Sequence, residues 1–121
     1  MAHLKSLRKH LLYLLTEGGA HATFEDAVKD VPPAARGTKP EGAAHTLWEL
    51  LEHMRIAQED ILDFSRNPSY KEKKWPDAYW PTEAAPPSEN AWTKCIQQFE
   101  SDLHELQELL AALAAVKGRA R

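Results

Sequence analysis

The sequence predicts an all-α fold, an up-and-down helical bundle with three long helices in one domain over residues 1–121. In three long segments the apolar residues recur every three or four positions, which is the period of an amphipathic helix. Proline- or glycine-rich stretches separate these segments, and no stretch shows the strict alternation that is typical of a strand. Helices with one apolar face each must pack against one another, which favours a bundle.

The composition is that of an ordinary globular protein, with 43% hydrophobic and 27% charged residues. The formal net charge of −3 gives no electrostatic reason to expect a nucleic-acid or membrane partner. The apolar run Leu11–Leu15 is too short for a membrane span or a secretory signal. A single cysteine, Cys95, excludes an internal disulfide. We therefore expect a cytoplasmic protein.

The first helix is expected over about residues 2–17, where four leucines form one apolar stripe. Gly18 and Gly19 then supply the left-handed conformation that often ends a helix. Farther on, Thr23 and Asp26 resemble a capping box, which predicts a short turn of helix before Pro32-Pro33.

The second helix is expected over residues 46–66. Thr46 and Glu49 form a T-x-x-E capping box at its start, and Asn67-Pro68 ends it, because a residue before proline avoids the helical region. The apolar face is expected to comprise Leu47, Leu50, Leu51, Met54, Ala57, Ile61 and Phe64.

A loop of about twenty residues, 66–87, contains five prolines and four aromatic residues, Tyr70, Trp75, Tyr79 and Trp80. Because disordered segments are poor in aromatic residues, we expect this loop to be packed, and loops of this length are often functional.

The third helix is expected over residues 88–116, with Ser88 as the N-cap and Gly118 just beyond the end. Its apolar residues follow the four-three alternation of a bundle seam. They are Trp92, Ile96, Phe99, Leu103, Leu106, Leu110 and Leu113.

The six histidines contain no pair spaced three or four residues apart, so no two on one helix could share a metal ion. His53 lies at the border of the apolar face of the second helix, with Glu49 one turn earlier. It could be a ligand with an acidic partner, or a boundary histidine paired with Glu49, and the spacing alone favours the second interpretation.

The remaining reactive side chains have simpler interpretations. Cys95 is expected to be a small core or boundary residue rather than a nucleophile. Glu100, Asp102, Glu105 and Glu108 are expected to form a solvated helix face. Phosphate-binding loops and common hydrolase motifs are absent from the sequence, so the residues taken alone do not establish an enzyme.

Three segments together resemble the DinB-like superfamily of damage-inducible helical-bundle proteins. They are HTLWELLEHMRIAQ at residues 45–58, continued by DILDF at residues 60–64, then WPDAYWP at residues 75–81, and GGAH at residues 18–21. The resemblance covers residues 4–110 approximately, and several unusual aromatic and proline positions agree within it.

This resemblance implies a four-helix bundle with a divalent metal ion (Zn, Ni or Fe) held by three histidines. One ligand belongs to the second helix and matches His53, and two belong to an H-x-x-x-H motif on a fourth helix. No H-x-x-x-H follows Leu113 in this sequence. We therefore expect an incomplete metal site, with His53 as its single ligand, and an exposed apolar seam that makes the chain a homodimer.

Two alternatives remain open. The first is a metal-dependent hydrolase or thiol-dependent transferase whose site is completed by a second subunit, with His21 or His104 as further ligands. The second is a non-catalytic helical module that binds another protein through the exposed seam.

Overall fold

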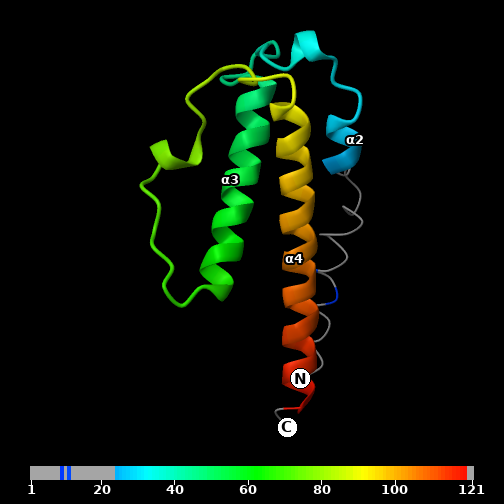
Figure 1. Ribbon diagram of the computed structural model, residues 1–121, viewed down its shortest axis with the longest axis vertical. Coiled ribbons are helices and arrows are strands. Elements are labelled where there is room, and N and C mark those ends of the chain that lie inside the picture. Colours follow the sequence, from blue (N-terminus) through cyan, green and yellow to red (C-terminus); the bar gives the residue numbers. More distant parts are fainter. Residues whose placement is uncertain (1–8, 10, 12–23, 120–121) are drawn as a thin grey trace. The chain divides into compact units, whose positions relative to one another are not determined.

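The computed structural model describes Lys9, Leu11 and residues 24–119, and these residues form helices and loops without a strand. Along the chain the elements are α2 (Phe24–Val28), the 3-10 turn η1 (Pro33–Ala35), α3 (Leu47–Arg66), the 3-10 turn η2 (Asp77–Tyr79) and α4 (Ala91–Arg119) (Figure 1). The all-α prediction is confirmed. The first expected helix, 2–17, lies outside the described residues except for Lys9 and Leu11, which are both helical.

The chain divides into two compact units, one of residues 31–102 and one that combines residues 1–30 with 103–121. The first unit contains α3, both 3-10 turns and the beginning of α4, and all interactions of the candidate site lie within it. The expectation of a single domain over residues 1–121 stays a prediction.

The predicted capping box is present at the start of α3. The Glu49 N–H donates to Thr46 Oγ1 at 3.1 Å, and the Thr46 N–H donates to Glu49 Oε1 at 2.8 Å. The Thr46 hydroxyl also donates to the carbonyl of Ala84 at 2.6 Å, which ties the end of the long loop to the helix. Thr46 is 3% exposed, so these bonds form away from water.

Two further amide groups of the first turn of α3 are satisfied by an earlier loop. The N–H groups of Leu47 and Trp48 donate to the carbonyls of Thr38 and Arg36, at 3.3 and 2.7 Å. These N–H groups have no acceptor within the helix, so the carbonyl groups of the loop serve as their acceptors. Gly37 lies between the two carbonyls, and a Cβ there would come within 2.6 Å of the Ala85 Cβ, so the close packing requires glycine.

The α3 helix ends as predicted. Asn67 is its C-cap with an extended backbone, φ −100° and ψ 111°, as the following proline requires.

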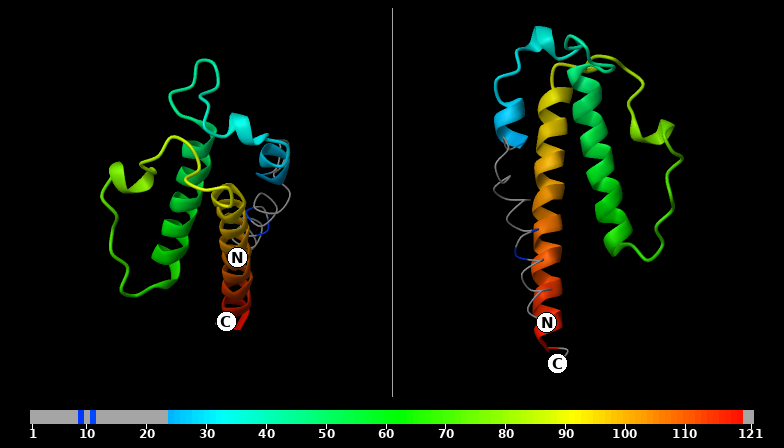
Figure 2. Two further views of the ribbon diagram at one scale, coloured as in Figure 1. Left: turned by 45° about the horizontal axis from the view of Figure 1, so that its top comes forward. Right: turned by 180° about the vertical axis from the view of Figure 1, so that it is seen from behind.

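The core of residues 31–102 lies between α3 and the first turns of α4. Its buried apolar side chains are Trp48, Leu51, Leu62, Trp92, Cys95 and Phe99. Gln58 reinforces the pairing by donating to the Phe99 carbonyl at 2.8 Å. On its other side α3 is accompanied by the long loop, so the helix lies between α4 and the loop in each view (Figures 1 and 2).

The expected apolar face of α3 packs only in part. Leu51 is 3% exposed, whereas Leu50, Met54, Ile61 and Phe64 are 37%, 45%, 55% and 69% exposed. The difference arises because the α4 side of the helix is built from Trp48, Leu51 and Leu62. The other apolar residues form a separate row with four-three spacing, here called the apolar stripe: Leu50, Met54, Ala57, Ile61 and Phe64.

The bounds of α4 differ by three residues at each end from those expected. The helix begins at Ala91, and the Asn90 carbonyl rather than the Ser88 carbonyl accepts the first helical bond, from the Lys94 N–H at 2.9 Å. At the other end it continues through Gly118 to Arg119. Glycine disfavours a helix by only about 1 kcal/mol, so it does not have to stop one. No helix among the described residues is long and apolar enough to cross a membrane.

We predict that Thr46→Ala lowers the free energy of unfolding by about 1–2 kcal/mol, because it removes an N-cap and a buried bond to Ala84. Urea denaturation followed by circular dichroism measures the change. Thr93→Ala, at an exposed position of α4, is the control and should differ little from the parent protein. Equal stabilities of the two variants would contradict the prediction.

Candidate functional site

The ring of His53 is held by the long loop. Its Nδ1 lies 2.7 Å from the carbonyl oxygen of Tyr79, and a carbonyl can only accept, so Nδ1 carries the proton. In the neutral ring the lone pair is therefore on Nε2. The expected pairing with Glu49 does not form, because Glu49 Oε1 accepts from the Thr46 N–H at the helix start.

A second histidine joins this region through an aromatic stack. The rings of His53 and His45 both stack on the indole of Trp80, each with a centroid distance of 3.9 Å and interplanar angles of 9° and 19°. His45 also lies 3.8 Å from Glu49 Oε1 through its Nδ1. His45 precedes the helix rather than belonging to it, so the backbone brings its ring to the same indole as His53.

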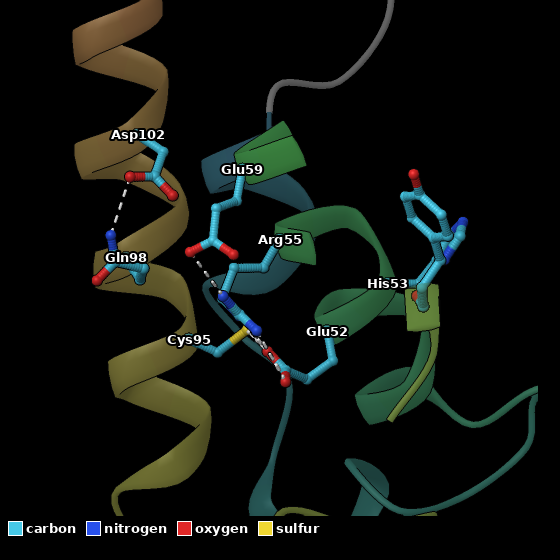
Figure 3. Close-up of polar contacts among 8 residues, drawn as sticks. Glu52, His53, Arg55, Glu59, Cys95, Gln98 and Asp102 are labelled. Carbon is cyan, nitrogen blue, oxygen red and sulfur yellow. Dashed lines mark hydrogen bonds and ion pairs between the residues drawn. The ribbon is translucent and has the colours of Figure 1, made fainter. Parts of the chain in front are cut away.

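On the opposite side of α3, a polar cluster faces α4 (Figure 3). Arg55 binds Glu52 through two nitrogens and lies 3.5 Å from Glu59 Oε2, and the Cys95 thiol donates to Glu52 Oε1 at 3.2 Å. The polar cluster is defined as Glu52, Arg55, Glu59 and Cys95. Figure 3 shows His53 pointing away from it, so the two groups belong to different faces of the helix.

Burial and hydrogen bonding keep the Cys95 thiol of the polar cluster protonated. Burial and the hydrogen bond to Glu52 raise the pKa of the Cys95 thiol to about 12, and the side chain is 4% exposed. The bond to Glu52 also raises the pKa of Arg55. The prediction that Cys95 is a core residue is confirmed.

Asp102 is buried at 4% exposure, so the expectation of a solvated carboxylate there is wrong. The Gln98 side chain donates to its Oδ1 at 2.9 Å, and Oδ2 has no hydrogen-bond partner among the described residues. The sequence-based prediction was wrong because Asp102 lies on the same buried face of α4 as Cys95 and Phe99, at a spacing of four and then three residues. Trp48 Nε1 is likewise buried without a hydrogen-bond partner in the described part of the chain.

Sequence reasoning missed a second contact between the loop and α3. The hydroxyls of Tyr70 and Tyr79 each donate to a different oxygen of Asp60, both at 2.6 Å. These bonds raise the pKa of both tyrosines, because loss of either proton would place a phenolate beside the carboxylate. The aromatic content of the loop was its only signal in the sequence.

The remaining histidines give no further ligand that the described residues show. His104 has a 70% exposed side chain, as expected, and its Nε2 lies 3.6 Å from Glu108. His3, His10 and His21 lie outside the described residues, so the suggestion of His21 as a further ligand stays a prediction.

A sequence model of the DinB superfamily matches residues 18–121 of the chain, which is most of its length. The chain belongs to the DinB superfamily. The match agrees with the resemblance found in the segments around His45–Gln58 and Trp75–Pro81. No curated protein and no solved structure matches the chain.

Membership of the DinB superfamily implies a bound metal ion, and the described side chains meet only some of the requirements of a metal site. The tautomer of His53 suits a ligand, because a backbone carbonyl fixes the other ring nitrogen. Within the described ranges, however, no group of three or more histidine, cysteine or acidic side chains could hold an ion. These residues therefore do not form a metal centre by themselves, and no catalytic step is derived through one.

We predict that Cys95 of the folded protein resists alkylation by iodoacetamide at pH 8. With a pKa of about 12, on the order of one thiol in ten thousand is ionised at that pH, and burial slows access further. Mass spectrometry over time measures the modification. The same protein in guanidinium chloride is the control and should react fully, whereas equal rates in both conditions would refute the prediction.

Proposed function

We propose that this DinB-superfamily chain contributes one ligand, His53, to a divalent-metal site that a second copy of the chain completes. The bond from His53 Nδ1 to the Tyr79 carbonyl, 2.7 Å long, carries the proposal. Histidines that bind metals almost always hold their other ring nitrogen in this way, because it fixes the tautomer and the ring direction. Stacking on Trp80 restricts the same ring further.

The need for a second copy follows from the number of ligands. Protein zinc sites use three or four protein ligands, and one imidazole does not retain the ion. Leu50 and Met54 of the apolar stripe lie within one turn of His53 on α3. A molecule that covers this stripe therefore comes close to the imidazole.

The apolar stripe also has the length and pattern of a helix–helix interface. From Leu50 to Phe64 it extends about 21 Å along α3, with the four-three spacing of a seam. A two-fold axis would place the same face of both copies together, so one stripe would cover the other. We therefore propose a homodimer that forms through the apolar stripe.

A divalent ion, when bound, would lower the pKa of a coordinated water or thiol and so generate a nucleophile. Metal-dependent hydrolysis and thiol-dependent transfer are the two activities proposed on that basis. The alternative is a non-catalytic module whose apolar stripe binds another helical protein. The exposure of Met54, Ile61 and Phe64 favours it as a second candidate.

We predict that the purified chain, loaded with zinc and dialysed, retains the ion as a dimer, and that His53→Ala abolishes this retention. Plasma mass spectrometry measures the metal content. His10→Ala removes a histidine that the proposed site does not use and is the control, which should keep the parent content. Retention of zinc by His53→Ala would overturn the proposal that His53 is a ligand. Retention of zinc by a monomer would overturn the proposal that a second copy completes the site.

We predict that Met54→Lys weakens the dimer by about tenfold or more, because burying a methionine side chain contributes about 1.5–3 kcal/mol. Sedimentation equilibrium measures the association. Lysine favours helices, so the fold should persist. Gln97→Lys adds the same charge at an exposed position of α4 and should leave the dimer unchanged. A monomer at every concentration of the parent protein would exclude the interface.

A further inference from the structure

An open groove lies between the C-terminal half of α3 and the long loop. Its volume is about 630 Å³, within the range of small-molecule sites. It is called here the Asp60 groove and is lined by Asp60, Ile61, Phe64, Tyr70, Glu72 and Tyr79. The proposed metal site does not use it, because neither His53 nor His45 lines it.

The carboxylate of Asp60 is fixed in the wall of the groove. Tyr70 and Tyr79 each donate to one of its oxygens at 2.6 Å, so neither oxygen can rotate away without losing a bond. Hydrogen bonds to a charged acceptor are shorter and stronger than neutral ones. The groove therefore carries a negative charge in a constant position.

Aromatic rings form much of the remaining wall. Phe64 is 69% exposed and meets Tyr70 edge to face, with centroids 5.4 Å apart. The face of an aromatic ring is electron-rich and attracts cations, and it also contacts methyl groups well. Ile61, 55% exposed, adds an aliphatic surface beside Phe64.

The charge of the lining has one sign. Asp60 and Glu72 are acidic, and no basic side chain among the residues that the structure describes lines the groove. Lys71, Lys73 and Lys74 belong to the same loop but are not among the lining residues. Carboxylates combined with exposed aromatic rings and no competing cation suit a positively charged organic group.

We propose that the Asp60 groove binds a small organic cation that carries a quaternary ammonium group. The methyl groups contact Phe64, Ile61 and the tyrosine rings, while Asp60 and Glu72 neutralise the charge. This site does not use the proposed metal ligand His53, but it shares Ile61 and Phe64 with the apolar stripe, so binding in the groove competes with association through the stripe.

The test compares choline with its neutral isostere 3,3-dimethylbutan-1-ol, using nuclear magnetic resonance titration of the full-length chain. The two probes have nearly the same shape, so a difference reports on charge. We expect choline to bind about tenfold more tightly or better, because cation–π and carboxylate contacts apply to it alone. Equal affinities, or choline binding that does not saturate, would overturn the proposal.

Two variants and a matched control locate the binding. Glu72→Gln and Phe64→Leu should each weaken choline binding by about three- to tenfold. Glu59→Gln makes the same charge change in the polar cluster, on the α4 side of α3, and should have no effect. Because Glu72 lies outside the apolar stripe, its variant leaves that surface unchanged, whereas Phe64→Leu alters both the groove and the stripe. Equal losses in Glu59→Gln and Glu72→Gln would assign the effect to net charge and reject the site.

Discussion

The arrangement of residues 31–102 depends on how the first turn of α3 satisfies its amide groups. A helix start leaves four N–H groups without partners inside the helix. Here Thr46 and the carbonyls of Arg36 and Thr38 accept from three of them, and the two carbonyls attach the preceding loop to the helix. The same threonine donates to Ala84, thirty-eight residues later. One helix terminus thereby joins three stretches of sequence.

The position of the candidate site follows from this junction. The long loop leaves α3 at Asn67 and returns to its beginning at Ala84, so it must travel the length of the helix. The path places Tyr79 and Trp80 beside His53, and Tyr70 beside Asp60. The loop thus packs along α3 and is joined to it by backbone and side-chain hydrogen bonds at several positions along the helix.

The two ends of α3 could be predicted because their rules are local. A T-x-x-E box and an Asn-Pro pair act within four residues, and both were found where the sequence indicated. The packing of the apolar residues was less predictable, since Leu50 and Leu51 both suit a core. Which of them is buried depends on where α4 lies, and that depends on contacts between distant residues.

The surroundings of His53 could not be predicted for a related reason. Its partner is a backbone carbonyl twenty-six residues away, and every residue type has the same carbonyl. The burial of Asp102 could not be predicted either, because other acidic residues lie near it in the sequence and nothing in the sequence distinguishes it from them. Membership of the DinB superfamily was predictable, since the resemblance rested on unusual aromatic and proline positions.

The double attachment of the loop has a consequence for how members of such a family can diverge. Between Tyr70 and Tyr79 the chain is mostly exposed and is held at both sides by Asp60. Doubling the length of a flexible loop costs only about 0.6 kcal/mol, so insertions here would scarcely disturb folding. Glu72 lies in that tolerant stretch and lines the Asp60 groove. Natural variation could therefore alter what the groove accepts while the helix beneath it stays the same.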